Sequence, residues 1–319
     1  MNVIKIAGQE IKPGESKEID IKIARLPSHT QIDTPIFIHR ALEDGPVLAL
    51  MAGMHGDEIN GVEIVRRILD SKLNRTIRGT VVCMPIVNVY GFLNYSREVP
   101  DGKDINRSFP GNRTGSLASR VAYHLMREVV PYIDYGIDFH TGGAARTNYP
   151  QIRCVMSNEK NVELAAAFSA PFTIDAPFRP RSLRQAASKK GKNIIVYEGG
   201  ESLRFDTHAI EVGLAGTLRL MKHLNMIDWA PEASEENRTV WNSTWVRART
   251  AGLFQANIRA GNKVGKNQWL GTMTDPFGGF KEQIKSPATG YVIGLNNAPV
   301  INAGDALLHI GLDDSCKIR

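Results

Sequence analysis

The apolar positions along the first two thirds of the chain predict strands that alternate with helices. Residues 47–52 form an uninterrupted apolar run, which is typical of a buried strand. Apolar residues over 59–69 then recur at the spacing of a helix with one buried face. A second apolar stretch, residues 132–139, predicts another strand. The chain therefore begins as a series of strand and helix units.

Further patterns add elements of both kinds. Strands are expected at 19–23, 34–38 and 80–88, and helices at 115–130, 158–170 and 207–224. Apolar strands that alternate with helices are usual in sheets with both faces covered. The pattern thus predicts an α/β domain over residues 1–235, with a largely parallel or mixed sheet flanked by helices.

The pattern changes after a polar stretch at residues 231–237, which we interpret as a linker. Beyond it, short apolar segments are separated by turns, and the segment 251–270 loosely repeats at 289–307. This pattern predicts a small all-β domain over residues 236–319, a barrel-sandwich that resembles biotinyl and lipoyl carrier domains. The segment 275–281, between the repeats, lacks the Met-Lys-Met surroundings of a biotin site. We therefore expect this domain to shape or shield the mouth of an active site.

The composition is ordinary for a globular protein, since 42% of the 319 residues are hydrophobic and 23% are charged. No apolar stretch approaches the roughly 18 residues needed to span a bilayer, and residues 1–10 lack the features of a signal peptide. We therefore expect a cytoplasmic protein with no membrane partner. Cys83, Cys154 and Cys316 are widely separated, so neither a disulfide framework nor a thiolate metal site is indicated.

The formal net charge of +6 comes from scattered cations, which are densest at residues 179–184 and 189–192. The sequence contains no pattern typical of a nucleic-acid-binding module, so we expect no nucleic-acid partner. A positive pocket that attracts a small anionic substrate accounts for the charge better. The sequence does not indicate the oligomeric state, and a homo-oligomer is possible.

Three side chains that can bind a metal follow the two buried strands. His55 and Glu58 come just after the first strand, and His140 ends the second. The carboxyl ends of strands meet at the sheet edge where ligands bind, so we expect these side chains to converge. Two imidazoles and one carboxylate are typical of a catalytic zinc, because a fourth position stays open. The sequence therefore predicts one Zn²⁺ per chain, with Asp138 placed to hydrogen-bond a ligand imidazole.

Hydrolysis at such a site needs a group that takes a proton from water and then delivers one to the leaving nitrogen. Glu198 is the candidate, because it ends the apolar run 193–197 and precedes two glycines that leave room for a reactant. Glu211 is a rival, but it falls inside a helical pattern, and Glu201 is a weaker one. We predict that Glu198 is the catalytic base and acid.

Four motifs follow one another along the chain. They are Gly-Met-His-Gly-Asp-Glu at 53–58, Ser-Arg at 96–97, Asp-Ile-Asn-Arg-Ser-Phe-Pro-Gly at 104–111 and Asp-Phe-His-Thr-Gly at 138–142. In this order they resemble the succinylglutamate desuccinylase and aspartoacylase family, relatives of the zinc carboxypeptidases. The resemblance implies a carboxypeptidase-like mixed sheet flanked by helices. It also implies a zinc-dependent hydrolase that cleaves the amide bond of an N-acyl amino acid or a related small molecule.

The resemblance assigns roles to three further residues. Arg97 would stabilise the negative oxygen of a tetrahedral intermediate, since a cation aimed at that oxygen is commonly the largest electrostatic contribution. Asn106 and Arg107 would bind the substrate carboxylate, which a guanidinium group matches with two hydrogen bonds. From its position six residues beyond His140, Arg146 could meet a second anionic group of the substrate, and Asp104 could orient Arg107 or cap the loop.

Two other functions fit the same residues. A zinc carboxypeptidase that acts on small peptides or cell-wall fragments would use the same constellation next to a C-terminal carboxylate. A non-catalytic metal-binding or ligand-binding protein would keep the scaffold without the activity. Residues competent for the chemistry fill every position of the predicted site, which favours an enzyme.

Overall fold

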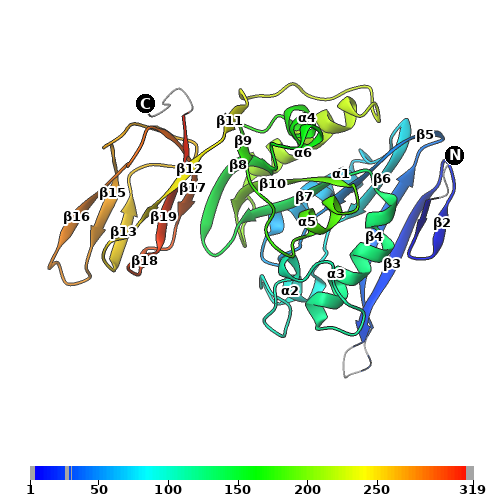
Figure 1. Cartoon of the computed structure of the whole chain (residues 1–319), viewed down its shortest axis with the longest axis horizontal. Coiled ribbons are helices and arrows are strands. Elements are labelled where there is room, and N and C mark those ends of the chain that lie inside the picture. Colours follow the sequence, from blue (N-terminus) through cyan, green and yellow to red (C-terminus); the bar gives the residue numbers. More distant parts are fainter. Residues whose placement is uncertain (1–3, 26–28, 30, 314–319) are drawn as a thin grey trace.

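The structure is a computed structural model that describes residues 4–25, 29 and 31–313 (Figure 1). The helices are α1 (Ile59–Asp70), α2 (Val89–Leu93), α3 (Leu117–Glu128), α4 (Glu159–Phe168), α5 (Leu183–Ser188) and α6 (Thr207–His223), with short 3-10 helices η1 (Ile105–Arg107) and η2 (Val130–Tyr132). The first strands are β1 (Ile4–Ile6), β2 (Gln9–Ile11), β3 (Ser16–Arg25), β4 (Gln31–Arg40), β5 (Glu43–Met51), β6 (Arg78–Met84), β7 (Tyr135–Gly142), β8 (Arg146–Cys154), β9 (Phe172–Asp175) and β10 (Asn193–Glu201). The later strands are β11 (Arg238–Val240), β12 (Ser243–Arg247), β13 (Gly252–Ala256), β14 (Lys263–Val264), β15 (Trp269–Thr274), β16 (Lys281–Lys285), β17 (Gly290–Asn296), β18 (Val300–Ile301) and β19 (Ala306–Leu312).

Most elements predicted from the sequence are present. The apolar run at 47–52 lies at the end of β5, and the amphipathic pattern behind it forms α1. The strand predicted at 132–139 begins later, at Tyr135, because the chain first makes the short helix η2 around Pro131. The sequence pattern does not predict β8, β9 or α5, and the loops expected there are in part regular structure.

A single sheet of thirteen strands runs through the described residues. Its main path follows the order β12-β19-β17-β8-β10-β7-β5-β6-β4-β3. The four strands β10, β7, β5 and β6 are parallel to one another, whereas β4 and β8 are antiparallel to the strands beside them in this group. The sheet is therefore mixed, as the sequence predicts.

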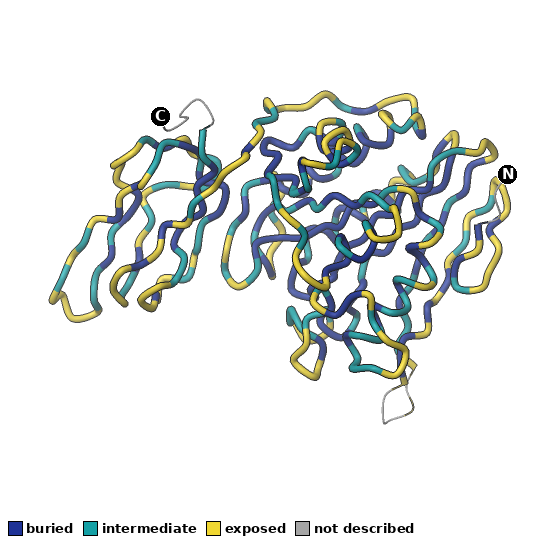
Figure 2. Tube along the Cα trace, in the orientation of Figure 1, coloured by how far each residue is buried: buried dark blue, intermediate teal, exposed yellow. Residues whose placement is uncertain are grey.

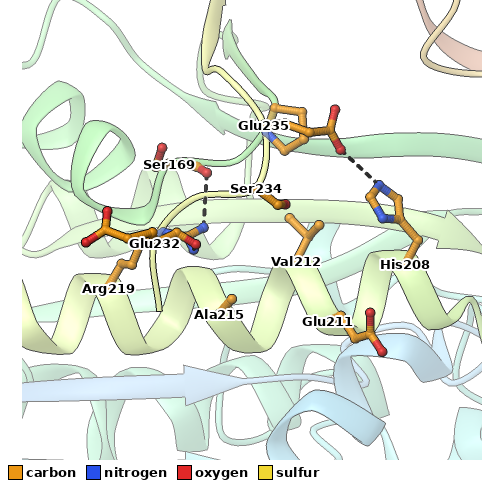
Figure 3. Close-up of a pocket in the computed structure, with 10 residues that line it drawn as sticks. Ser169, His208, Glu211, Val212, Ala215, Arg219, Glu232, Ser234 and Glu235 are labelled. Atoms are coloured by element: carbon orange, nitrogen blue, oxygen red, sulfur yellow. Dashed lines mark hydrogen bonds and ion pairs between the residues drawn. The ribbon is translucent and has the colours of Figure 1, made fainter. Parts of the chain in front are cut away.

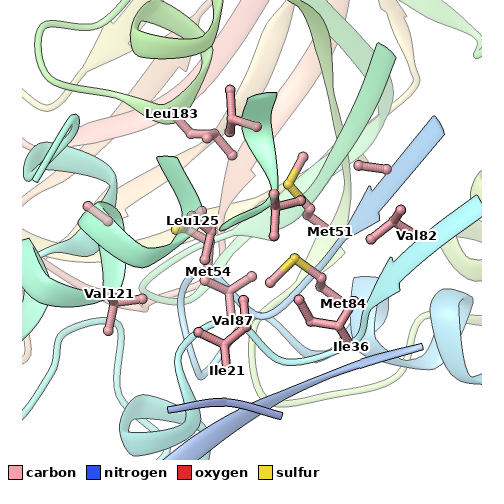
Figure 4. Close-up of a cluster of buried hydrophobic side chains, with 14 of the residues drawn as sticks. Ile21, Ile36, Met51, Met54, Val82, Met84, Val87, Val121, Leu125 and Leu183 are labelled. Carbon is pink, nitrogen blue, oxygen red and sulfur yellow. The ribbon is translucent and has the colours of Figure 1, made fainter. Parts of the chain in front are cut away.

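Helices cover the central strands from both sides, which explains why the buried part of β5, residues 47–51, is apolar throughout. In β5, Ala49 and Met51 belong to one buried cluster, whereas Leu48 and Leu50 belong to the other. Side chains of α3 and α5 complete the first cluster (Figure 4), and those of α1, α4 and α6 complete the second. The buried stretches in Figure 2 accordingly follow the middle of the sheet.

Helix α1 packs very close to β7, at Gly61. A Cβ atom at this position would lie 2.5 Å from the Cβ atom of Phe139, so only a residue without a side chain permits this approach. Because Glu58 stands at the N-cap of α1, the close packing brings its side chain to the end of β7.

Strand β8 changes its partner in the middle. Residues 146–148 pair with β17 of the C-terminal part, whereas residues 151–154 pair with β9. Pro150 lies between these two stretches, where the β8 and β10 register also shifts. A proline cannot donate a backbone hydrogen bond, so it is tolerated at such a break in the ladder. Because of this break, β8 pairs with β17 of the C-terminal part at one end and with β9 of the α/β part at the other.

The C-terminal part contains strands and no helix among the described residues beyond 224. Its strands form two sheets around a separate apolar core, which confirms the expected all-β character. One sheet continues the large sheet through β17 and β8, and β11 pairs with β9. The second sheet has the order β16-β15-β13-β18. The two parts therefore lie side by side and share strand pairs (Figure 1).

No helix in the described part of the chain is long and apolar enough to cross a membrane. Cys83 and Cys154 are buried free thiols, and burial raises the pKa of Cys83 to about 12. Cys316 lies outside the described residues.

Candidate functional site

The three predicted metal ligands converge in a buried cluster. Nδ1 of His55 lies 2.8 Å from Oε1 of Glu58, and Nδ1 of His140 lies 2.8 Å from Oε2 of the same carboxylate. All three side chains are at least nine-tenths buried, and one ligand atom from each lies within 4.8 Å of the others. The arrangement places two nitrogen donors and one carboxylate around a common point.

Local backbone contacts fix the loop that carries His55. Gly56 donates its backbone N–H to the carbonyl of Ser96, and a Cβ atom at Gly56 would overlap the backbone of Gly91. On the other side, the backbone N–H of Thr141 donates to Oε2 of Glu58 at 3.1 Å. Close packing therefore requires a glycine at position 56. Backbone hydrogen bonds fix both the loop that carries His55 and the carboxylate of Glu58.

The donor set fits a divalent metal ion. The outer nitrogen of each imidazole faces a carboxylate: Nε2 of His55 lies 3.2 Å from Oδ1 of Asp104, and Nε2 of His140 lies 3.0 Å from Oδ2 of Asp138. The second contact is close enough for an ion pair but is not aligned as a hydrogen bond. A carboxylate at Nε2 favours a proton there, which would leave each Nδ1 lone pair available to a divalent cation held together with Glu58.

The pKa values of the cluster also indicate a site for positive charge. Burial lowers the pKa of His140, but Asp138 and Glu58 outweigh it and hold this pKa well above its usual value. Burial raises the pKa of Glu58, but the charges of His55 and His140 outweigh it and hold this pKa well below its usual value. The carboxylates of the cluster therefore attract positive charge, which a divalent cation supplies.

Arg97 lies beside the cluster and is held by acidic groups. Its Nη2 lies 2.8 Å from Oδ2 of Asp104, and its Nη1 lies 3.3 Å from Oε1 of Glu58. We expected Asp104 either to orient Arg107 or to cap the loop. Its Oδ1 accepts a hydrogen bond from the backbone N–H of Asn106 at 2.7 Å, which confirms the cap, but its carboxylate pairs with Arg97 and His55 and not with Arg107. Asp104 thus connects a candidate ligand to the candidate oxyanion-stabilising cation.

Glu198 stands next to the cluster on the neighbouring strand. It is the register partner of His140 between the parallel strands β10 and β7. Its Oε2 accepts a hydrogen bond from the side-chain amide of Asn148 and lies 3.2 Å from Nη2 of Arg153. Both partners come from β8, and the sequence pattern identified neither of them.

The remaining predicted residues line the same cavity but differ in their contacts. Oδ1 of Asn106 accepts a hydrogen bond from the backbone N–H of Leu183 at 2.9 Å. Arg107 is exposed and donates from Nη1 to the backbone carbonyl of Asn106 at 2.6 Å. Arg146 is exposed at the start of β8. The two arginines therefore reach the cavity with guanidinium groups that are accessible to an anion.

The cavity that contains these residues has a volume of about 1010 Å³. The carboxyl ends of the central strands form its floor, and the segment after β9 forms one wall. Ser243, Trp245 and His309 of the C-terminal part also line it. The C-terminal strands therefore shape the cavity, as the sequence led us to expect.

The rival acidic residues lie elsewhere. Glu211 is exposed on α6 and lines a separate cavity of about 150 Å³ together with His208 and Arg219 (Figure 3). There, His208 faces Glu235 at 3.4 Å (Figure 3). Glu201 accepts a hydrogen bond from Asn297 instead of facing the candidate ligands. Of the three carboxylates compared, Glu198 is the one that lines the large cavity.

The fold and the cluster define an α/β protein with a candidate metal centre at the carboxyl ends of its central strands. The model of the succinylglutamate desuccinylase/aspartoacylase catalytic domain matches residues 44–224, which is more than half of the chain. The chain therefore belongs to the succinylglutamate desuccinylase/aspartoacylase family, which confirms the resemblance read from its motifs. This match spans the candidate ligands and Glu198.

Individual relatives are distant in sequence but similar in structure. An N-alpha-acetyl-L-2,4-diaminobutyric acid deacetylase of Halomonas elongata is 24% identical over 247 residues, covering 73% of this chain and 71% of the relative. The ectoine utilization protein EutE (DoeB) of Ruegeria pomeroyi has a TM-score of 0.85 at 20% identity, covering 98% of this chain and 99% of the other. A succinylglutamate desuccinylase/aspartoacylase of Rhodobacter sphaeroides has a TM-score of 0.84 at 22% identity, covering 95% and 97%. These likenesses extend the shared fold into the C-terminal strands.

Proposed function

We propose that the protein is a zinc-dependent amide hydrolase that removes an acyl group from an N-acyl amino acid or a related small molecule. The observation that carries this proposal is the convergence of His55, Glu58 and His140, whose Nδ1 atoms and carboxylate face one another in a buried cluster. The Halomonas relative, which is named as a deacetylase of an N-acetylated amino acid, supports the same class of reaction.

The residues of the cluster would hold a single zinc ion. His55 and His140 would bind it through Nδ1 and Glu58 through its carboxylate, because these are the atoms that face one another. A bound zinc ion supplies a Lewis acid for the scissile carbonyl and lowers the pKa of water at the site. Asp104 and Asp138 orient the two imidazoles from outside.

Glu198 acts as the general base and then as the general acid. Asn148 and Arg153 both contact Oε2, which leaves Oε1 as the oxygen that receives a proton from the attacking water. The same carboxyl group then delivers this proton to the amide nitrogen, and the C–N bond breaks as the amine leaves. Its register with His140 supports this role, because the two residues are partners on neighbouring strands.

Arg97 stabilises the negative oxygen that forms when water attacks the carbonyl. Its Nη1 already lies 3.3 Å from Glu58, at the edge of the candidate metal centre. Asp104 contacts both Nε and Nη2 of Arg97, at 3.2 and 2.8 Å, and so fixes the plane of the guanidinium group. A cation held in place before the reaction stabilises the developing charge without reorganisation.

Arg107 and Asn106 anchor the carboxylate of the amino-acid part. The guanidinium group of Arg107 is exposed to the cavity, and its bond to the carbonyl of Asn106 limits its movement. The bond from Leu183 holds the amide of Asn106 beside it. Arg146 offers a second cation for a substrate with a further anionic group.

Assays of the zinc-loaded protein on N-acyl amino acids and on short peptides test this proposal. We expect turnover of N-acetyl, N-succinyl or longer N-acyl amino acids, and loss of that turnover when a chelator removes the metal. Faster hydrolysis of peptides would instead favour a carboxypeptidase. Zinc binding without hydrolysis of either class would favour a non-catalytic protein.

A further inference from the structure

One end of the large cavity is an aromatic wall supplied by the C-terminal strands. The rings of Trp245 on β12 and His309 on β19 are stacked, with centroids 4.0 Å apart and planes inclined by 6°. Nε2 of His309 forms a hydrogen bond with Oγ of Ser243 at 2.8 Å. His309 is buried, whereas Trp245 keeps 41% of its surface exposed. His309 and Ser243 therefore form a fixed backing, and Trp245 presents an accessible indole.

The wall is uncharged and lies beside a cation. Burial, together with the nearby charge of Arg153, lowers the pKa of His309 to about 3, so its imidazole is neutral at physiological pH. Nδ1 of His309 is buried and has no hydrogen-bond partner within the described residues. The field of Arg153 disfavours an ammonium group at this end of the cavity.

The strand order places the wall far from the proposed carboxylate anchor. Starting from β5, which precedes His55, the order is β7 with His140, β10 with Glu198, β8 with Arg153, and then β17 and β19. Asn106 lies on the side of the candidate metal centre that is away from the wall. It belongs to the loop of Asp104, which contacts His55, and His55 follows β5. The wall nevertheless comes close to the candidate base, because β17 contributes only a glycine between them. A Cβ atom at Gly294 would lie 3.0 Å from Oδ1 of Asn148, a residue that binds Glu198, and 3.4 Å from the Cβ atom of His309.

We propose that Trp245, backed by His309, forms a subsite for a flat or extended apolar acyl group, so that the protein favours N-aroyl or medium-chain N-acyl amino acids over N-acetyl ones. This inference rests on the proposed function. A substrate anchored at Arg107 with its scissile carbonyl at the metal centre must direct its acyl group past Glu198, towards this wall.

Other residues at this end of the cavity suit the same group. Ile174, at the end of β9, and Phe178 line the cavity from the segment opposite the wall. Ile174 is the strand partner of Val240, and Ser243 of the wall follows Val240 by three residues. This pairing keeps the segment that carries Ile174 close to the wall. The volume of about 1010 Å³ lies at the upper end of the usual range for small-molecule sites and far exceeds the needs of an acetyl group.

Binding measurements test the subsite without relying on turnover. The probes are N-acetylglycine, N-hexanoylglycine and N-benzoylglycine, and the protein is the zinc-supplemented Glu198→Gln variant, studied by calorimetry. We expect N-benzoylglycine to bind at least about tenfold more tightly than N-acetylglycine, because its ring is buried against the indole. Adding Trp245→Ala should remove this difference, whereas Trp245→Phe should keep most of it.

Trp241→Ala is the matched control, since this residue is also an exposed tryptophan but does not line the cavity. It should leave all three dissociation constants unchanged. If Trp245→Ala does not fold, Trp245→Leu replaces it and should favour the hexanoyl probe over the benzoyl probe. Equal affinities for the acetyl and benzoyl probes, or a difference that survives removal of the indole, would overturn the subsite.

The outcomes separate this inference from the proposed function. Hydrolysis of N-acyl amino acids by the wild-type protein, with no dependence of affinity on Trp245, would refute the subsite and retain the function. A difference that depends on Trp245, with no hydrolysis of any N-acyl amino acid, would retain the subsite and refute the function.

Discussion

Glu198 and His140 are direct partners in the register between the parallel strands β10 and β7. Residues that are paired in this way project from the same face of a sheet, about 4.8 Å apart across the strands. The candidate base therefore lies beside a candidate ligand because of strand pairing, which is more rigid than a loop. This relationship links the fold to the proposed chemistry.

Replacement of that base should stop the reaction without disturbing the metal centre. Glu198→Gln removes the proton acceptor but keeps the size of the side chain and its bond from Asn148. We expect the rate constant kcat to fall by roughly 10²- to 10⁴-fold, with the zinc content unchanged. Steady-state kinetics and metal analysis of the same preparation provide the measurement.

Glu211→Gln is the control for this experiment, because Glu211 is exposed and lines the separate small cavity. Its kinetics should match those of the wild type. A Glu198→Gln protein with normal activity, or a Glu211→Gln protein without activity, would show that the base has been assigned to the wrong residue.

The carboxylate behind His140 should tune metal affinity. Asp138 lies 3.0 Å from Nε2 of His140, and Asp138→Asn removes the charge that favours the required imidazole tautomer. We expect zinc affinity to fall by about 10- to 100-fold, measured by competition with a chelator. Asp175→Asn, also in the cavity wall, should leave the affinity unchanged. Equal affinities in all three proteins would exclude a role for Asp138 in metal binding.

Close packing of α1 should be necessary for both stability and the metal centre. A side chain at Gly61 meets the Cβ atom of Phe139 at 2.5 Å, so Gly61→Val must push α1 away from β7. We expect the free energy of unfolding to fall by about 1–3 kcal/mol and zinc affinity to decrease, because Glu58 precedes the displaced helix. Gly265→Ala, at a position where an added Cβ atom meets nothing closer than 3.9 Å, is the control in urea denaturation. A fully stable Gly61→Val protein would contradict the packing.

The buried imidazole of the aromatic wall should make the protein sensitive to acid. The pKa of His309 is about 3 in the folded protein against a usual value of 6.5. As pH falls below 6.5, the unfolded chain takes up a proton there and the folded protein does not, so stability decreases towards pH 3. This group alone should cost about 2 kcal/mol between about pH 7.5 and pH 5.

His309→Phe isolates that contribution, because phenylalanine preserves a ring beside Trp245 but cannot bind a proton. Urea denaturation at both pH values should show a smaller loss of unfolding free energy in the variant than in the wild type. The comparison uses the change with pH, since loss of the bond to Ser243 lowers stability at both values. Identical pH dependences would mean that His309 titrates normally in the folded protein.

The sequence predicts the central strands and the convergence of the candidate ligands for a physical reason. A strand segment that is buried on both faces, such as residues 47–51 of β5, must be apolar throughout, so it is visible in the sequence. His55 and Glu58 come in the loop after the end of β5, and His140 lies near the end of β7. Periodicity and position together therefore place His55, Glu58 and His140 at one sheet edge.

Strand β8 shows why other parts are not predictable in this way. Pro150 interrupts its pattern, and its partners change from β17 to β9 on either side of that residue. The contacts of Asn148 and Arg153 with Glu198 depend on this arrangement, so no local pattern reveals them. Trp245 and His309 are likewise brought to the cavity only by the pairing of distant strands.

Metal stoichiometry tests the central claim most directly. The protein, purified without chelators and supplemented with zinc, should contain one tightly bound zinc ion per chain by elemental analysis after gel filtration. Glu58→Ala should contain none while keeping its fold, because it removes the carboxylate that both Nδ1 atoms face. A wild-type protein with no stoichiometric zinc, or a Glu58→Ala variant that binds as much as the wild type, would contradict the account.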